Sequence, residues 1–363
     1  MTLNRLLSLA LATFACSLQA HAAYFTERPE VQLFIEEIAA RNNLDAIQIR
    51  NALEGATPLP KVIELVKPPA NPGVRSWQRY RARFIDTTRI KGGLSFWQEN
   101  EATLHAAEAR SGVPAEIIVS LIGVETVYGR NTGNFSALSA LATLAFDYPP
   151  RAELFRRELE ALFMLAREQS RDVTSYRGSY AGALGLPQFL PSSVRNFAVD
   201  GDNSGQIDLA ASTADAIFSV ANFLAQHGWQ RDGKIVMPAR ISDENKAREL
   251  VEAGILPTLD VARLAAGGVR SALPADSREL TTLVDLITPE VGTEYWLGFQ
   301  NFYVITRYNR SSFYAMIVHD LAQVLKAERA QLGSAQPAQA GAASPPKKST
   351  KAKTAPREKH RGA

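Results

Sequence analysis

The segment PAEIIVSLIGVETVYGR, residues 114–130, ends a long apolar run with a glutamate, Glu125. A proline at its start and the Ser-Gly pair just before it are typical of the beginning of a helix. The apolar residues continue for several turns without a break. The segment therefore predicts a largely buried helix over residues 114–128, with Glu125 in its last turn.

On such a helix Glu125 shares a face with Ile118, Leu121 and Ile122, because residues three, four and seven apart are neighbours. Aliphatic surroundings penalise the charged form of a carboxyl group, so its pKa should rise towards neutral pH. A carboxyl that keeps its proton near neutral pH suits a general acid. The alternative is a frayed helix end that leaves Glu125 in water, and periodicity does not decide between the two.

Most of the remaining chain has the 3.6-residue periodicity of helices. Helices are predicted over residues 30–41, 94–110, 151–169, 212–227 and 313–332. From Lys234 the pattern changes to short β-rich runs separated by Pro and Gly, over residues 235–237, 283–287 and 294–306. The chain is therefore predicted to be α+β and mainly α-helical, with a small antiparallel β subdomain.

Residues 1–22 have the pattern of a cleaved signal peptide. Arg5 supplies the positive charge, residues 6–18 are almost wholly apolar, and Ala20-His21-Ala22 matches the small-residue cleavage site. The apolar run is shorter than the roughly 20 residues that span a bilayer. We therefore expect export to the periplasm and cleavage near Ala23.

Cys16, the one cysteine of the chain, lies inside this segment. The alternative to a released protein is a lipoprotein anchored through Cys16. Bacterial lipoprotein sites usually have Leu three residues before the cysteine, where this chain has Thr13, so release is favoured. A mature chain without cysteine would have neither disulfides nor a thiolate nucleophile.

Composition predicts a globular protein with an uneven charge distribution. Of the 363 residues 46% are hydrophobic and 21% charged, and the net charge is +3. Residues 345–363 contain seven Lys and Arg against one Glu, a net of +6 that leaves −3 for the rest. The folded part therefore has no basic bias, and no nucleic-acid partner is expected.

The basic tail, residues 333–363, contains no aromatic residue and is rich in Ala, Pro, Gln, Ser and Lys. Such a composition cannot bury enough apolar surface to offset chain entropy, so disorder is predicted. One hypothesis is a loose association of the tail with anionic polymers of the cell envelope. The alternative is a solvated tail without a specific partner.

The segment SYAGALGLPQFLPSSV, residues 179–194, combines glycines and prolines with polar and aromatic side chains. Small residues let a backbone approach a ligand closely. Ser179, Tyr180 and Gln188 supply neutral hydrogen-bonding groups, and Phe189 supplies a flat apolar face. This set suits a sugar better than a phosphate or a metal, although such loops usually just turn the chain.

Six colinear stretches between about residues 75 and 325 closely resemble the lytic murein transglycosylase B family: GVETVYGRNTG, LATLAFDYPPRAELFRREL, YAGALGLPQFLPSS, DGDNSGQIDL, SVANFLAQHGW and RYNRSSFYAMIV. The resemblance implies a lysozyme-like catalytic core with extra helices. It also implies cleavage of the MurNAc-β-1,4-GlcNAc bond of peptidoglycan glycan strands, with formation of 1,6-anhydromuramyl ends. Glu125 matches the family's single catalytic acid/base.

The resemblance also assigns residues that bind the saccharide. The positions that match the family's cleft are Ser179, Gln188, Phe189, Tyr308, Asn309, Tyr314 and Tyr80. Two positions depart from the family pattern. Pro150 and Arg151 stand where the family commonly has Arg-Arg, so Arg151 alone inherits that role, and Phe223 replaces a cleft tyrosine.

The stretch DGDNSGQIDL resembles an EF-hand loop. Its oxygen ligands would be the side chains of Asp200, Asp202 and Ser204 and the carbonyl of Gln206. The closing glutamate of an EF-hand is absent, since Ala211 stands there. The resemblance implies a longer loop closed by Asp215. One structural Ca²⁺ is favoured over a plain turn, and no cofactor is expected for catalysis.

The predicted organisation is a signal peptide (1–22), a helical region with the lysozyme-like core and the EF-hand-like loop (23–228), a small β-rich subdomain (229–306), a C-terminal helix that returns to the core (307–332) and the basic tail (333–363). Two other functions stay open. One is a muramidase-type hydrolase that uses water, and the other is a peptidoglycan-binding scaffold without activity.

Overall fold

The computed structural model describes residues 24–68, 73, 75–289 and 291–334. The predicted signal peptide and all but the first two residues of the predicted tail lie outside these ranges. Within them, none of the helices combines the length and the apolar character needed to cross a membrane.

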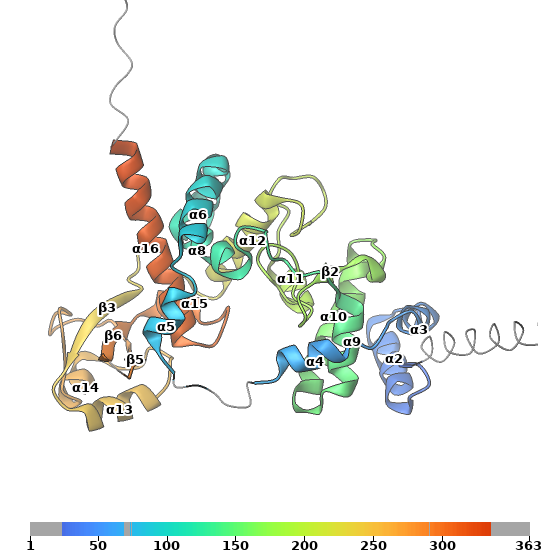
Figure 1. The fold of residues 1–363 in the computed structure, drawn as a ribbon, viewed down its shortest axis with the longest axis horizontal. Helices are drawn as coiled ribbons and strands as arrows, with labels where there is room; N and C mark the ends of the chain where they lie inside the picture. The colour runs from blue at the N-terminus through green and yellow to red at the C-terminus, as the bar shows by residue number, and fades with distance from the viewer. Residues whose placement is uncertain (1–23, 69–72, 74, 290, 335–363) are drawn as a thin grey trace, which may run out of the picture.

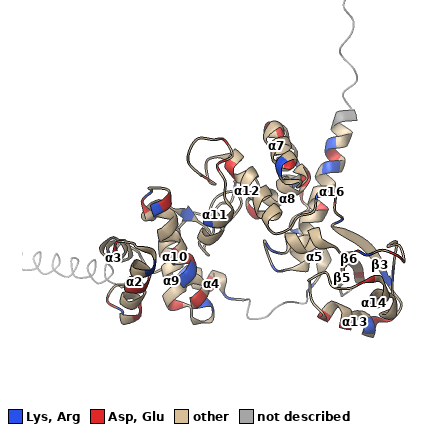
Figure 2. Ribbon diagram, turned by 180° about the vertical axis from the view of Figure 1, so that it is seen from behind, with Lys and Arg blue, Asp and Glu red and all other residues tan. Residues whose placement is uncertain are grey.

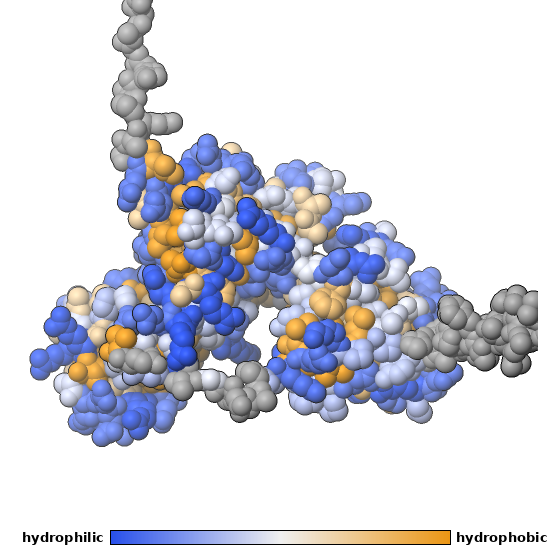
Figure 3. Space-filling model, viewed as in Figure 1, coloured by the Kyte–Doolittle hydropathy of each residue, from blue (hydrophilic) through white to orange (hydrophobic). Residues whose placement is uncertain are grey.

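The described chain forms two lobes (Figure 1). The α9–α10 lobe contains α2 (Pro29–Asn42), α3 (Ala46–Glu54), α4 (Pro60–Val66), α9 (Ala137–Asp147) and α10 (Ala152–Glu168). The α8–α16 lobe contains α5 (Trp77–Ala82), α6 (Thr87–Glu99), α8 (Ala115–Thr126), α16 (Ser312–Ser334) and a four-stranded sheet. The surface between the two lobes is hollowed (Figure 3). Acidic and basic residues are interspersed along the helices of both lobes (Figure 2).

Shorter elements connect the lobes. Helix α11 packs on α10, and α12 packs on α7, α8 and α11. Their bounds and those of the remaining connecting elements are α7 (Glu101–Ser111), α11 (Pro191–Phe197), α12 (Thr213–Gln226), η1 (Pro149–Arg151), η2 (Val173–Ser175), β1 (Phe135–Ser136) and β2 (Arg177–Gly178). Strands β1 and β2 pair antiparallel and hold the start of the loop that follows β2.

Most helices were predicted within a few residues, but the single helix predicted over residues 94–110 is wrong. The chain breaks there into α6 and α7 at Asn100, whose backbone angles are not helical. The Asn100 side chain donates to the Phe96 carbonyl oxygen at 2.8 Å. A short amide that bonds its own backbone competes with the helix, which explains the break.

The sheet is antiparallel throughout, in the order β4-β3-β6-β5. Its strands are β3 (Val236–Ile241), β4 (Val269–Ser271), β5 (Thr282–Thr288) and β6 (Gly292–Gly298), and α13 (Glu244–Glu252) and α14 (Val261–Ala266) cover one face. The predicted β run over residues 294–306 is wrong beyond Gly298, because α15 (Gln300–Ile305) follows. Phe302 and Ile305, three residues apart, are both fully buried, a helical spacing that the β-rich composition concealed.

Helix α8 is the centre of the main core. Eleven of its residues are buried, and it lies against α6 and α16. Such a helix is apolar on all sides because it has no solvent face. Ser120, its buried hydroxyl, donates to the Val318 carbonyl oxygen of α16 at 2.6 Å. The core therefore fixes α8 against α16, and with it the position of Glu125. The division of the chain into the regions 23–228, 229–306 and 307–332 stays a prediction.

Candidate active site

Glu125 lies in the last turn of α8, and that turn is not frayed. The Val127 amide donates to the Gly123 carbonyl oxygen at 3.1 Å, which closes the helix end. Val127 and Tyr128 have φ angles of 52° and 60°, in the left-handed region that a β-branched residue rarely adopts. Backbone strain of this kind persists where the surrounding structure holds it, often at functional sites.

The surroundings of Glu125 are those predicted from the sequence. Ile118, Leu121 and Ile122 are each 0% exposed, and burial raises the pKa of the Glu125 carboxyl to about 7. The Tyr314 hydroxyl donates to Glu125 Oε1 at 2.5 Å and partly offsets this rise in pKa. The predicted rise in pKa is confirmed, and the alternative of a frayed, solvated Glu125 is wrong.

Tyr128, which the sequence analysis did not single out, fixes the turn after Glu125. Its ring lies against Gly92, Gly93 and Gly123, where an added Cβ would overlap the ring or its hydroxyl. The hydroxyl donates to the Arg89 carbonyl oxygen at 3.0 Å, and Arg89 Nε donates to the Gly123 carbonyl oxygen at 3.1 Å. The pairing of glycines on α6 and α8 with one tyrosine was the available signal.

Three tyrosines from distant parts of the sequence surround Glu125. The rings of Tyr308 and Tyr314 are nearly parallel, with centres 6.4 Å apart. Tyr308 donates its hydroxyl hydrogen to the Pro187 carbonyl oxygen at 2.6 Å. The pKa of Tyr80 is raised by burial and, to a smaller extent, by the charge of Glu125. The structure thus brings Tyr80, Tyr308 and Tyr314 together at the predicted acid.

The loop after β2 is held by its own backbone. The Leu184 amide donates to the Phe189 carbonyl oxygen at 2.7 Å, and the Leu186 amide donates to the Leu209 carbonyl oxygen at 2.8 Å. Its glycines do not face a ligand, as the sequence had suggested. An added Cβ at Gly185 would overlap the Leu209 backbone, and one at Gly182 would overlap Leu141. These glycines instead let the loop pack closely against the protein itself.

The polar and aromatic residues of this loop are also engaged internally. Gln188, with a φ angle of 52°, donates to the Thr132 and Gly185 carbonyl oxygens at 3.0 and 2.9 Å. Phe189 is 2% exposed and packs against Phe223 and Tyr308, so the expectation of a free aromatic face at Phe189 is not met.

Ser179, half-buried, is the remaining loop residue that the resemblance assigned. Its Oγ accepts from the Ala181 and Ala183 amides at 3.3 and 3.1 Å. These two bonds fix the turn of the loop immediately after β2. The Ser179 hydroxyl hydrogen has no acceptor among these contacts.

Asn309 and Arg151 lie at the periphery. Asn309 is exposed beside Tyr308, and its carbonyl oxygen accepts from the Ser311 amide at 2.7 Å. Arg151 is exposed at the end of η1, with its guanidinium 5.3 Å from the centre of the Phe155 ring. Neither residue contacts Glu125 through a bond described here. Phe223, which stands in place of a cleft tyrosine, packs on Tyr308 with ring centres 4.9 Å apart.

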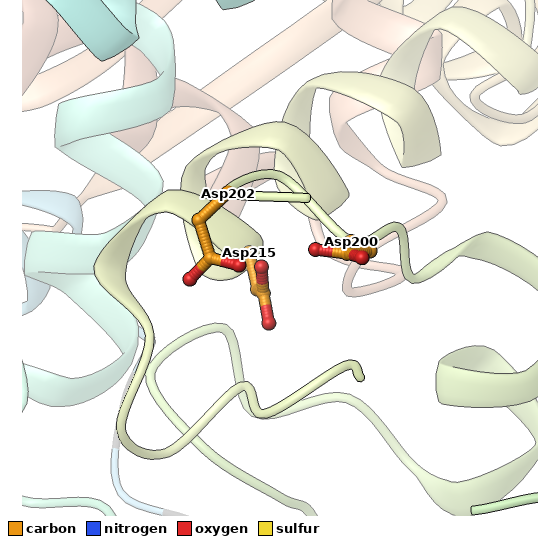
Figure 4. A group of neighbouring side chains, drawn as sticks. All are labelled: Asp200, Asp202 and Asp215. Atoms are coloured by element: carbon orange, nitrogen blue, oxygen red, sulfur yellow. The ribbon is translucent and has the colours of Figure 1, made fainter. Parts of the chain in front are cut away.

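A second cluster, separate from Glu125, consists of the carboxylates of Asp200, Asp202 and Asp215 (Figure 4). One oxygen of each lies within 4.8 Å of the others. Asp215 is 0% exposed and accepts from the amides of Gly201 at 2.8 Å and Asp208 at 2.7 Å. The first turn of α12 is thereby joined to the loop that precedes it.

The two remaining predicted ligands lie in the same loop. The Ser204 hydroxyl donates to the Gln206 carbonyl oxygen at 3.1 Å, and the Ser204 amide lies 3.0 Å from carboxylate oxygens of both Asp200 and Asp202. Hydrogen bonds from Ser212 and Ser204 lower the pKa of Asp202. An all-oxygen set with three carboxylates suits a hard cation such as Ca²⁺, so the residues present fit that ion.

Residues 26–323 match the family model of the transglycosylase SLT domain. The chain belongs to this family. It is 39% identical over 318 residues to membrane-bound lytic murein transglycosylase B of Escherichia coli K12, and the match covers 85% of each protein. The family match and the relative establish the chain as a lytic murein transglycosylase.

Solved structures agree with this family and with a lysozyme-like fold. Soluble lytic transglycosylase SltB1 from Pseudomonas aeruginosa is 44% identical, with a TM-score of 0.77 over 83% of this chain and 100% of SltB1. The E. coli lytic transglycosylase Slt35, solved in complex with calcium, is 38% identical, with a TM-score of 0.75 over 85% of this chain and 96% of Slt35. The predicted family and fold class are confirmed.

Proposed function

We propose that this enzyme cleaves the MurNAc-β-1,4-GlcNAc bond of peptidoglycan and forms a 1,6-anhydromuramyl end, with Glu125 as its single general acid/base. The observation that carries the proposal is a carboxyl group with a pKa of about 7 at the end of a buried apolar helix. A group with this pKa can both give and take a proton near neutral pH.

In the first step the protonated Glu125 carboxyl gives its proton to the glycosidic oxygen as the bond from that oxygen to C1 of MurNAc breaks. In the second step the Glu125 carboxylate takes the proton of the MurNAc C6 hydroxyl while that oxygen bonds to C1. Glu125 ends the cycle protonated, and no water is consumed. The Tyr314 hydroxyl, 2.5 Å from Oε1, holds the carboxyl in one orientation and stabilises its charged form.

Ordinary glycosidases need a second carboxylate, roughly 5 to 9.5 Å from the first, as a nucleophile or to activate water. In the part of the chain that the structure describes, burial and Tyr314 account for the pKa of Glu125, and no other carboxylate contributes. This favours a hydroxyl of the substrate over water. A relative that is 27% identical, SltB3 from P. aeruginosa, was solved in complex with NAG-anhNAM-pentapeptide, which contains such an anhydro sugar.

The glycan strand would lie in the hollow between the two lobes (Figure 3). Tyr80, Tyr308 and Tyr314 would contact the sugar next to Glu125. Ser179, Gln188 and Phe189 would shape the opposite wall, since Gln188 and Phe189 are engaged with the protein itself. Asn309 and Arg151, both exposed, would bind outer parts of the substrate.

Mass analysis of the products from purified sacculi tests the proposal. Anhydro ends are expected from the wild-type enzyme, and none from Glu125→Gln. Reducing ends that incorporate ¹⁸O from labelled water would instead identify a hydrolase. Intact glycan with retained binding would identify a scaffold.

We further propose that one Ca²⁺ braces the loop that ends at Asp215 and takes no part in the chemistry. The ion would be held by the side chains of Asp200, Asp202, Ser204 and Asp215 and by the Gln206 carbonyl. The convergence of three carboxylates within 4.8 Å supports this, and the related Slt35 was solved in complex with calcium. Bound there, the ion would neutralise charges that otherwise repel one another.

The enzyme is also proposed to act in the periplasm after cleavage near Ala23. The pattern of Arg5, the apolar run and Ala20-His21-Ala22 supports this, although these residues lie outside the described part. The E. coli relative is named as membrane-bound. Intact mass of the protein extracted from the envelope tests the point, and a diacylated Cys16 would replace the released form with a lipoprotein.

A further inference from the structure

A cavity of about 620 Å³ lies at the outer edge of strand β5, where the sheet meets the start of α16. Val251, Gly254 and Ile255, at and beyond the end of α13, form one wall. The consecutive residues of β5 from Thr282 to Asp285 form the floor. The polar and aromatic residues that complete it are Arg75, Tyr80, Arg310, Ser312 and Phe313.

This cavity adjoins the surroundings of Glu125. Tyr80 lines the cavity, and the charge of Glu125 acts on the Tyr80 hydroxyl. The Tyr80 ring lies 5.6 Å from the ring of Phe313, the residue that precedes the Glu125 partner Tyr314. A substituent on the sugar at Glu125 could therefore pass Tyr80 and enter the cavity without crossing the protein core.

The charges that line the cavity favour an anionic ligand. Arg75 and Arg310 supply two positive charges and Asp285 supplies one carboxyl, whose pKa is raised by burial. Arg75 is fixed in place because Nη2 donates to Ser312 Oγ at 3.0 Å and the guanidinium lies 4.1 Å from the centre of the Phe313 ring. Arg310 is exposed at the rim. A held guanidinium suits a carboxylate, which it can bind through two parallel hydrogen bonds.

The floor of the cavity offers backbone groups as well. Strand β5 is an edge strand with β6 as its neighbour on one side. Alternate residues of an antiparallel strand direct their N–H and C=O groups away from the partner. Apart from the bridge between Leu259 and Thr281, no other strand of the described chain pairs with this edge. An exposed edge of this kind can accept an extended peptide by main-chain hydrogen bonds.

We propose that this cavity binds the stem peptide carried by the muramyl residue at Glu125, with its backbone along β5 and a carboxylate on Arg75 and Arg310. Residues 282–285 span roughly 13 Å, enough for three or four residues of an extended peptide. Pairing through the main chain does not depend on the side chains of the stem. The inference rests on the proposed function, because it requires a muramyl sugar at Glu125.

The test compares two substrates with one double variant, Arg75→Ala with Arg310→Ala. The substrates are glycan strands that carry stem peptides and the same strands after an amidase has removed the peptides. For the variant, KM on peptide-bearing strands should rise about tenfold, the usual scale for losing a charge-assisted contact at a partly exposed site. KM on stripped strands should stay as in the wild type. Arg240→Ala on β3, an exposed arginine at a different position of the sheet, is the matched control and should change neither value.

An equal change in KM on both substrates, or none on either, would overturn the inference. Arg310→Ala by itself guards against a folding defect, because it leaves the Arg75 contacts with Ser312 and Phe313 intact. It should show a smaller rise in KM on peptide-bearing strands only. Titration with the free pentapeptide by calorimetry gives an independent readout: binding by the wild type and weakened binding by the double variant support the site, and absent binding by the wild type contradicts it. Failure of the proposed function would differ, since the wild type would then release no anhydro product from either substrate.

Discussion

Glu125→Gln should abolish cleavage and at the same time stabilise the protein above neutral pH. Burial raises the pKa of Glu125 from 4.5 to about 7, so between these values the folded state binds more protons than the unfolded state. The free energy of unfolding of the wild type should therefore fall as pH rises through this window. At about 1.36 kcal/mol per pKa unit the full loss is roughly 3.4 kcal/mol, and partial exposure of the carboxyl to solvent reduces it to about 2 kcal/mol.

Glutamine keeps the shape of the side chain and can still accept the Tyr314 hydrogen bond, but it does not ionise. Urea unfolding at pH 4.5, 6 and 8, at a fixed Ca²⁺ concentration, measures the difference in stability between variant and wild type. That difference should grow in favour of the variant by about 2 kcal/mol from pH 4.5 to 8. Glu252→Gln removes an exposed carboxylate on α13 and should show no such growth. A constant difference across this range would refute the assignment of a buried, proton-holding Glu125, and residual turnover by the variant would refute its catalytic role.

Three further predictions follow from the same contacts. Tyr314→Phe removes the hydrogen bond that lowers the pKa of Glu125, so the alkaline limb of the pH profile of kcat/KM should move up by about one unit; an unchanged limb would show that the bond does not matter to the acid. Gly123→Ala places a Cβ on the Tyr128 hydroxyl and should cost about 2 kcal/mol of stability in urea together with most of the activity, whereas Gly55→Ala, which meets only ordinary contacts, should be nearly neutral; equal effects would contradict the packing argument. Ca²⁺ at a hundred times its Kd should stabilise metal-stripped wild type by about 2.7 kcal/mol and raise its Tm, and Asp200→Ala with Asp202→Ala should remove the response; identical melting of the wild type with and without Ca²⁺ would leave the loop a plain turn.

Local periodicity was enough to predict the helix that carries Glu125. Ile118, Leu121 and Ile122 share one face at helical spacing, and the same face is fully buried in the structure. The raised pKa of Glu125 follows from that face and needs no knowledge of the rest of the fold. The fold class and the family also followed from the sequence, because six ordered stretches spread over the chain resemble one family.

Contacts between residues far apart in the sequence could not be predicted from periodicity. Tyr314 lies 189 positions from Glu125, and only the packing of α16 against α8 brings its hydroxyl to the carboxyl. The use of glycines for close packing inside the protein rather than for ligand contact likewise depends on which backbone lies opposite each glycine, as at Gly185 and Leu209. The break at Asn100 and the helix α15 depend on single side-chain bonds and burial, which a composition window averages away.

The features of this site that cost stability lie within four residues of one another. A buried carboxyl at Glu125 and two residues in left-handed conformation, Val127 and Tyr128, each make the folded state less favourable. The buried helix that precedes them offsets these costs, since its apolar residues pack on all sides. The left-handed turn ends α8 directly after Glu125, so the carboxyl can be dehydrated by its own helix and still reach a substrate. A longer helix would bury the acid beyond reach, and a frayed one would return its pKa to the ordinary value, so the strained turn is what allows both properties in one residue.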